Sequence, residues 1–189
     1  MLAMTYDQWS KNDSVVYPCI SQPKLDGWRC MASKTGLFSR EGNRFTNLAH
    51  IEAALAAFFA QNPDVILDGE LYRHGLSLGE IAGILSAKSG TTEAIQFHIF
   101  GIATAHRDLT LPPSDSVRQV ESAICNTRGE LNRACKRYLA DGYEGQIIRH
   151  KDFTYKQGRS STLLKRKHVY DKKDAERVYR NFAAAFAAV

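Results

Sequence analysis

The order of predicted strands and helices is the feature that most limits how this chain can fold. Strands are expected in neighbouring pairs, such as the hairpin formed by residues 28–33 and 37–39 around a Lys-Thr-Gly turn. Apolar residues recur at helical spacing in residues 48–59 and again in residues 77–87. These elements do not alternate regularly as strand, helix and parallel strand. We therefore expect an α+β fold with two antiparallel β-sheets flanked by helices.

The remaining segments extend this prediction. Thr46 or Asn47 can cap the first helix, and residues 115–138 predict two helices separated by a Thr-Arg-Gly sequence. Short apolar or alternating runs predict further strands at residues 19–23, 65–67, 95–102, 145–149 and 163–167.

The length and composition fit one globular domain. The chain has 189 residues, of which 44% are hydrophobic, which suffices for a single sizeable core. No apolar stretch reaches the length of a membrane-spanning helix, and the N-terminus lacks the basic start and apolar run of a signal peptide. We therefore expect a cytoplasmic protein without a membrane partner. None of the four cysteines lies in a Cys-x-x-Cys pair, so we expect reduced, partly buried thiols.

The positive charge is concentrated towards one end of the sequence. The net charge is +5. Residues 149–180 hold 11 Lys or Arg and 4 Asp or Glu, a balance of +7, and the remainder holds 14 and 16, a balance of −2. A basic end on a nearly neutral body indicates a polyanionic partner, although a solvated basic face fits the charge equally well.

The first candidate for chemistry is Lys24, in the segment Pro-Lys-Leu-Asp-Gly-Trp-Arg of residues 23–29. This lysine follows a strand and precedes a glycine, which lets the backbone approach a ligand closely. An amine is a nucleophile only when it is neutral, and burial or neighbouring cations lower the pKa of a lysine. Taken alone, the segment fits a surface turn with a solvated lysine better than an activated nucleophile.

Two acidic residues stand beside glycines at predicted strand ends. In Leu-Asp-Gly-Glu-Leu, residues 67–71, the apolar run places Glu70 at the end of a buried strand, where a carboxylate can hold a ribose hydroxyl or a metal ion. In residues 141–149, Glu144 enters an apolar strand from a glycine-flanked turn. Two carboxylates suit Mg²⁺, the usual partner of nucleoside triphosphates. Each segment alone also fits an ordinary strand end.

Two lysines close the set of candidates. Lys165 and Lys167 lie two residues apart on a predicted strand, so their side chains point to the same face. Such a pair can clamp a phosphate, and an exposed strand edge is the plainer interpretation of this segment by itself.

The order of these segments is more informative than any one of them. Lys-x-Asp-Gly-x-Arg, Ser-Arg-x-Gly, Asp-Gly-Glu-Leu, an aromatic strand, Glu-Gly-x-x-x-Arg and Leu-Leu-Lys-x-Lys follow one another between Gln22 and Lys167. This set resembles the nucleotidyltransferase superfamily of ATP-dependent DNA ligases, RNA ligases and mRNA capping enzymes. The resemblance implies the ATP-grasp-like catalytic fold of these enzymes, with ATP and Mg²⁺ or Mn²⁺ as cofactors.

Within this superfamily, the chain is most similar to DNA ligases, particularly compact viral or phage-like ones. Arg29 keeps an arginine that many RNA ligases replace with serine, and Ser39 and Arg40 resemble the segment that meets the 5′-phosphate of a nick. The resemblance implies a monomeric DNA ligase that seals nicked duplex DNA in the cytoplasm, or in the host-cell cytoplasm if the protein is viral. An RNA ligase or capping-type nucleotidyltransferase is the alternative, and a binding module without transfer activity is a third reading.

The resemblance also implies roles for the residues of the nucleotide site. Lys24 attacks the α-phosphate of ATP and forms lysyl-AMP. Gln22 reads the adenine amino group, and Phe100 stacks on the adenine. Glu70 holds the ribose, and Glu70 and Glu144 support the metal ion.

Basic residues are implied to hold phosphates. Lys165, Lys167 and Arg29 bind the nucleotide, and Arg40 binds the phosphate of the nick. The chain departs from the family pattern at Gly101, where an acid usually follows the stacking aromatic residue.

The resemblance further implies a domain division. Residues 1–170 are expected to form the nucleotidyltransferase domain and residues 171–189 a C-terminal tail, without the OB-fold domain that usually follows in ligases.

Overall fold

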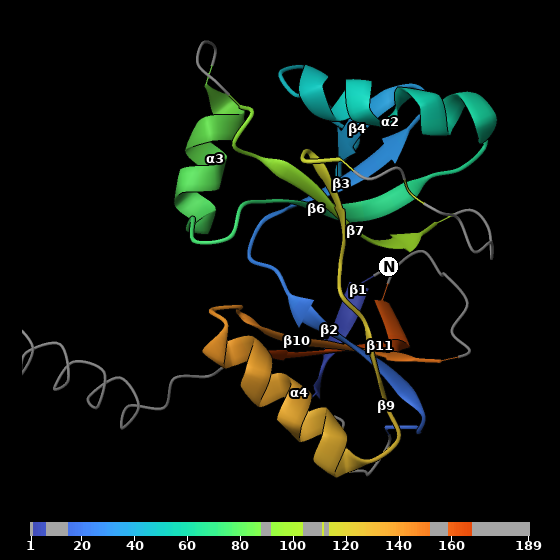
Figure 1. Cartoon of the computed structure of the whole chain (residues 1–189), viewed down its shortest axis with the longest axis vertical. Helices are drawn as coiled ribbons and strands as arrows, with labels where there is room; N and C mark the ends of the chain where they lie inside the picture. The colour runs from blue at the N-terminus through green and yellow to red at the C-terminus, as the bar shows by residue number, and fades with distance from the viewer. Residues whose placement is uncertain are drawn as a thin grey trace, which may run out of the picture.

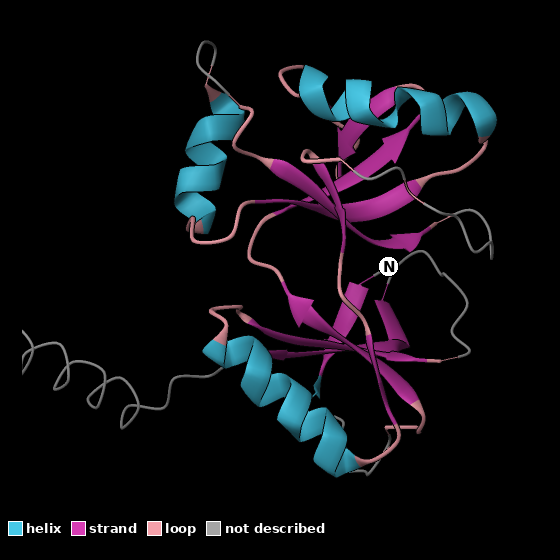
Figure 2. Ribbon diagram, in the orientation of Figure 1, coloured by secondary structure: helices cyan, strands magenta, loops and turns pink. Residues whose placement is uncertain are grey.

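The computed structural model describes residues 2–6, 15–87, 92–103, 111, 114–151 and 159–167. Two β-sheets lie one above the other, and helices cover the outer sides of both (Figure 1, Figure 2). Over the described residues, no helix has the length and apolar character needed to cross a lipid bilayer.

The upper sheet in Figure 1 has six strands in the order β5-β4-β3-β6-β7-β8. With helices α2 (Ala49–Gln61) and α3 (Leu78–Ser86) it forms what we name the six-stranded lobe. Only β7 and β8 are parallel neighbours in this sheet; the other neighbouring strands are antiparallel. The strands are β3 (Trp28–Ser33), β4 (Gly36–Ser39), β5 (Arg44–Phe45), β6 (Leu67–Tyr72), β7 (Gln96–Ile102) and β8 (Val117–Gln119).

The lower sheet has five strands in the order β1-β11-β10-β2-β9. With helix α4 (Arg128–Ala140), which lies along its outer side, it forms the five-stranded lobe. Here β1 and β11 are parallel, and the other neighbours are antiparallel. The strands are β1 (Leu2–Thr5), β2 (Cys19–Lys24), β9 (Ala123–Cys125), β10 (Gly145–His150) and β11 (Arg159–Lys167).

The six-stranded lobe is an insertion in the sequence of the five-stranded lobe. The chain leaves β2 through residues 25–27 and enters β3, and it returns from β8 to β9 through residues 120–122. The returning segment is anchored at both ends. Val120 N donates to Ile99 O at 2.8 Å in the upper sheet, and Ala123 pairs with Ser21 in the lower one.

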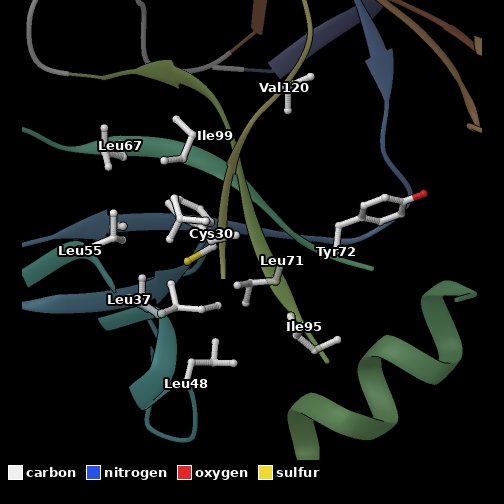
Figure 3. Close-up of a cluster of buried hydrophobic side chains, with 14 of the residues drawn as sticks. Cys30, Leu37, Leu48, Leu55, Leu67, Leu71, Tyr72, Ile95, Ile99 and Val120 are labelled. Carbon is white, nitrogen blue, oxygen red and sulfur yellow. The ribbon is translucent and has the colours of Figure 1, made fainter. Parts of the chain in front are cut away.

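The apolar cores of the two lobes differ in size. A large cluster of buried side chains fills the six-stranded lobe, and Figure 3 shows part of it, including Leu37, Leu55, Leu67, Leu71 and Ile99. The corresponding cluster of the five-stranded lobe is much smaller and consists of Tyr6, Cys19, Cys125, Leu131, Ile148 and Leu164.

A buried polar network supplements the small core. Tyr138 donates its hydroxyl to Ser21 O at 3.1 Å, and the amide of Gln146 donates to Ser21 Oγ at 2.7 Å and to Leu131 O at 3.0 Å. Because buried polar groups need such partners, this network fixes α4 on β2 and β10.

The predicted α+β fold with two sheets flanked by helices is confirmed. Both sheets are largely antiparallel, with one parallel pair at an edge of each. The hairpin around residues 34–36 and the first two helices occur where expected. The four cysteines are all buried free thiols, as predicted.

The prediction of two helices in residues 115–138 is wrong in its first half. Strands β8 and β9 occupy it, and only α4 is helical. The apolar residues of this segment resemble a helical pattern because they are buried in two different cores. Val117 and Val120 are buried in the six-stranded lobe, Cys125 is buried in the five-stranded lobe, and Ile124 between them is exposed.

Two details of the remaining elements also differ. The buried strand begins at Leu67 and continues to Tyr72, so Glu70 lies within β6 and not at the end of a strand. The residue that precedes α2 is Leu48, and no side chain caps this helix; the amide of Asn47 donates instead to Leu85 O at 2.9 Å. The predicted tail at residues 171–189 lies outside the described residues.

Candidate active site

A cavity of about 200 Å³ lies between the two lobes. Residues from β1, β2, β3, β6, β7, β10 and β11 contribute to it, so both sheets are needed to form it. Six of the predicted site residues line it: Gln22, Lys24, Arg29, Glu70, Phe100 and Lys165. The other lining residues are Ala3, Pro23, Leu25, Asp68, Ile147, Arg149 and Leu163.

Lys24 is positioned by close backbone packing. It is the last residue of β2, pairs with Gly145 of β10, and accepts a hydrogen bond from Glu144 N at its carbonyl oxygen, at 3.1 Å. A Cβ atom on Gly145 would lie 2.1 Å from Arg166 O, and one on Gly27 would lie 2.3 Å from Leu71 O. Only glycine allows these approaches, which explains the glycines that the sequence places beside Lys24 and Glu144.

Glu144 links two of the three lysines of the predicted site. Lys24 Nζ forms an ion pair with Glu144 Oε2, and Lys167 Nζ lies 2.6 Å from Glu144 Oε1. Burial would raise the pKa of Glu144, but the hydrogen bonds from Lys167 and Lys24 outweigh it and hold this pKa below its ordinary value. The bond to Glu144 likewise raises the pKa of Lys167. The carboxylate is therefore ionised and holds Lys24 at the cavity wall.

Arg29 is fixed by a residue that the sequence analysis missed. Its guanidinium makes a two-point contact with the buried carboxylate of Asp68, through Nε to Oδ1 at 2.9 Å and through Nη2 to Oδ2. Such forked pairs hold arginine in one orientation. Asp68 begins the same Asp-Gly-Glu segment as Glu70, and residues two apart on a strand share a face. The two-residue spacing between Asp68 and Glu70 could therefore have indicated from the sequence that Asp68 also faces the site.

Glu70 occupies an environment that disfavours its charge. Burial raises the pKa of this carboxyl to about 7, and Asp68 adds to the rise, although Lys24 and Arg29 oppose it. A carboxyl that titrates near neutral pH can either donate or accept a hydrogen bond, as a ligand hydroxyl requires.

Two guanidinium groups lie near the ring of Phe100. The Cζ atoms of Arg29 and Arg149 lie 5.6 Å and 5.4 Å from its ring centroid. A Cβ atom on Gly101 would lie 3.2 Å from Arg149 Nη1, so Arg149 fills the space beside the position where the family resemblance leads us to expect an acid. The sequence analysis gave Arg149 no role, although it is the arginine of the Glu-Gly-x-x-x-Arg segment.

Gln22 presents a buried acceptor at the cavity. The residue is 4% exposed, and its Nε2 donates to Ser122 Oγ at 2.9 Å. Its Oε1 has no hydrogen-bond partner among the described residues. A buried amide oxygen without a partner is costly, so it marks a place where a donor on a ligand would bind favourably.

Arg40 is not among the residues that line the cavity. It is exposed in the turn that follows β4, where Ser39 Oγ accepts hydrogen bonds from Glu41 N at 3.2 Å and Asn43 N at 3.3 Å. This turn belongs to the six-stranded lobe, and any contact of Arg40 would be with a ligand larger than the cavity.

The acids of the site fit a cation that arrives with phosphates. Across the described residues, no group of three or more His, Cys, Asp or Glu side chains could hold a metal ion by itself. Mg²⁺ is commonly bound by one or two carboxylates together with substrate phosphates, so this donor set does not require a closed protein cage. Glu70 and Glu144, both beside Lys24, are the carboxylates available for such a shared site.

Comparisons of the sequence identify relatives among DNA ligases. The DNA ligase of phage T4 is 24% identical over 238 residues, which cover 90% of this chain and 48% of the relative. A DNA ligase of African swine fever virus is 29% identical over 182 residues, which cover 80% of this chain and 42% of the relative. The chain thus spans about half the length of the curated relatives it matches. No protein-family profile matches it.

Solved structures show the same fold. The ATP-dependent DNA ligase of phage T7 in complex with ATP superposes with a TM-score of 0.65 at 18% identity, covering 88% of this chain and 67% of the other. The Chlorella virus DNA ligase-adenylate gives 0.66 at 22% identity over 88% and 66%. A Lig E DNA ligase gives 0.68 at 22% identity over 89% and 68%. The chain is therefore similar in sequence to phage and viral DNA ligases and has the fold of the ATP-dependent DNA ligase structures.

Proposed function

We propose that this chain is the catalytic domain of an ATP-dependent DNA ligase, which forms lysyl-AMP at Lys24, transfers AMP to a 5′-phosphate at a nick and seals the strand. The observation that carries the proposal is the position of Lys24. It ends β2 at the wall of a cavity that also presents an aromatic ring, a buried amide oxygen and several cations. Such a cavity fits a purine nucleotide with its phosphates directed towards the lysine.

The nucleotide is held by side chains from both lobes. Phe100 stacks on adenine, and the unpartnered Oε1 of Gln22 accepts a hydrogen bond from the adenine amino group. Glu70 binds a ribose hydroxyl, which its near-neutral pKa allows it to do in either protonation state. Arg29, held by Asp68, and Lys165 bind phosphate oxygens.

The chemical step transfers AMP to the amine of Lys24. The nitrogen attacks the α-phosphorus, the bond from that phosphorus to the bridging oxygen breaks, and pyrophosphate leaves with the bonding electrons. Lys24 must lose a proton for this step. Glu144 already accepts a hydrogen bond from Lys24, so it is placed to receive that proton or to hold the amine in line.

Phosphate charge is neutralised by cations of the site. Bound Mg²⁺, which Glu70 and Glu144 would help to hold, would supply charge neutralisation on the phosphates. Lys167 forms an ion pair with Glu144, one of the carboxylates that would hold Mg²⁺. Lys167 therefore contributes a second positive charge near the phosphates.

The later steps use the surface of the domain. AMP passes from Lys24 to the 5′-phosphate of nicked duplex DNA, and the 3′-hydroxyl then displaces AMP as the phosphodiester forms. The exposed Arg40 is the residue we assign to the phosphate of the nick. We expect the protein to act as a monomer in the cytoplasm, or in the host-cell cytoplasm if it is viral.

The test is covalent labelling of the intact chain. After incubation with ATP and Mg²⁺, intact mass spectrometry should show the addition of one AMP, and peptide mapping should place it on Lys24. Lys24→Ala should remain unlabelled, whereas Lys136→Ala, which removes an exposed lysine on α4, should label like the wild type. Equal labelling of the Lys24→Ala chain would falsify the assignment.

A further inference from the structure

Ser122 lies on the segment that returns from the six-stranded to the five-stranded lobe. This segment is held at both ends, by Val120 N on Ile99 O and by the pairing of Ala123 with Ser21. Ser122 is therefore fixed in position beside β2, although the residue itself is exposed.

The hydroxyl of Ser122 is part of a directed chain of hydrogen bonds. It donates to Val120 O at 3.4 Å and accepts from Gln22 Nε2 at 2.9 Å. Because a hydroxyl has one proton, donation to Val120 leaves only lone pairs for Gln22. The NH₂ group of the Gln22 amide therefore points towards Ser122. The amide oxygen, Oε1, is left without a hydrogen-bond partner among the described residues.

The direction of this amide decides which base fits. An acceptor at the cavity suits a purine with an amino group at position 6, and it repels a purine with a carbonyl there. A reversed amide would present a donor and reverse the preference. Discrimination of this kind is strong where a buried polar group is left unpaired by the wrong ligand.

We propose that Ser122 is a positioning residue that sets the direction of the Gln22 amide and thereby selects adenine over 6-oxo purines. This inference rests on the proposed function, because it assumes that the cavity binds a nucleotide base. Ser122 is not a catalytic residue, since it acts on the base only through Gln22.

The test measures binding without chemistry, using nucleotides that lack a leaving group. Calorimetry with the full chain should compare AMP, IMP and purine riboside 5′-monophosphate, which has no substituent at position 6. The wild type should bind AMP most tightly. Ser122→Ala should reduce the preference for AMP over purine riboside monophosphate by about three- to tenfold, the usual effect of one neutral hydrogen bond. Its affinity for purine riboside monophosphate should stay the same.

Two matched variants separate positioning from folding. Ser122→Thr keeps the hydroxyl and should keep the AMP preference, and Ser86→Ala, which removes an exposed hydroxyl at the end of α3, should change nothing. Equal weakening of all three nucleotides by Ser122→Ala, an unchanged preference, or tighter wild-type binding of IMP would each overturn the inference.

The outcome is distinguishable from that of the labelling test. Selective AMP binding that Ser122→Ala weakens, in a chain that forms no lysyl-AMP, would support the role of Ser122 and refute nucleotidyl transfer. A wild-type chain that binds no AMP would refute the role of Ser122, whatever the labelling shows.

Discussion

The two lobes are stabilised in different ways. The six-stranded lobe has a large, almost wholly apolar core, in which Leu37, Leu67 and Leu71 are fully or nearly fully buried. The five-stranded lobe has a small apolar cluster and relies in addition on hydrogen bonds among Ser21, Tyr138 and Gln146. The hydrophobic effect is non-directional, whereas a hydrogen bond requires a defined distance and angle. The lobe that carries Lys24 is thus the one with the more geometrically specified interior.

The two predicted site acids beside Lys24, Glu70 and Glu144, show the same contrast. Glu70 of the six-stranded lobe has a raised pKa because burial disfavours its charge, and Glu144 of the five-stranded lobe has a lowered pKa because two lysines stabilise its charge. One lobe thus offers a nearly neutral acid suited to a hydroxyl, and the other offers a firmly ionised one suited to cations. This difference teaches that the two lobes contribute different chemistry beside Lys24.

The largest expected effect is a loss of unfolding free energy when a leucine is truncated in either apolar core. Leu71→Ala and Leu164→Ala remove the same atoms from fully buried strand positions in the two lobes. Such changes cost about 2–5 kcal/mol, according to how far the surroundings can relax into the cavity. We expect Leu71→Ala near the upper end and Leu164→Ala near the lower end, measured by urea unfolding. Equal losses would show that the five-stranded lobe depends on apolar packing just as strongly.

The next largest effect is the pH dependence of folding stability that Glu70 and Glu144 produce. Because the pKa of Glu70 in the folded state, about 7, lies above its ordinary value of 4.5, its stabilising contribution is complete below about pH 4.5 and is lost as the pH rises through 7. Glu70→Gln should therefore gain stability relative to the wild type between about pH 5 and pH 8, by roughly 2 kcal/mol after allowance for its partial exposure.

Glu144 should behave in the opposite way. Its lowered pKa gives a contribution that is present above the ordinary value and is lost as the pH falls through the folded-state pKa. Glu144→Gln should therefore be less stable than the wild type at neutral pH, and the difference should shrink in acid. Urea unfolding across this pH range measures the stability of both variants, and parallel stability curves for the two would remove the contrast between the two lobes.

The smallest expected effect is the loss of stability when the hydroxyl of a buried tyrosine, Tyr138 or Tyr72, is removed. Tyr138→Phe leaves the buried Ser21 O without its 3.1 Å donor, which should cost about 1–2 kcal/mol. Tyr72→Phe in the six-stranded lobe removes a bond of 2.9 Å to His74, which is exposed, so water can replace the hydroxyl and the cost should stay below about 0.5 kcal/mol. Thermal unfolding of the two variants provides the comparison. A larger loss for Tyr72→Phe would contradict the assignment of the polar interior to the five-stranded lobe.

The parts of the fold that depend on local pattern could be predicted. The β3–β4 hairpin has a turn signal, and α3 begins with a Ser77–Glu80 capping box that is visible in the sequence. Strands β8 and β9 could not be predicted from the sequence. Their apolar residues are buried in two different cores, so they do not alternate regularly as the residues of a single half-buried strand do. The parallel pairing of β1 with β11 joins the two ends of the described chain and leaves no local trace.

The site was predictable to the extent that its residues lie in short motifs. Gln22, Lys24, Arg29, Glu70 and Phe100 were expected together, and the fold brings them to one cavity. Residues that act through another residue were missed, since their role depends on contacts across the fold. The Gln22 amide meets a serine 100 positions away, and no spacing rule gives such a contact.

The insertion of one lobe within the other has a consequence for biosynthesis. Lys24 and Glu144 are 120 positions apart, and the strand that carries Lys24 pairs with β10, which follows Glu144 directly. At ribosomal rates of about 5–20 residues per second, β10 emerges roughly 6–24 seconds after β2. During that interval all elements of the six-stranded lobe are synthesised, while the edge of β2 that pairs with β10 lacks its partner. A translating ribosome therefore synthesises the whole six-stranded lobe well before Lys24 can acquire its carboxylate partner.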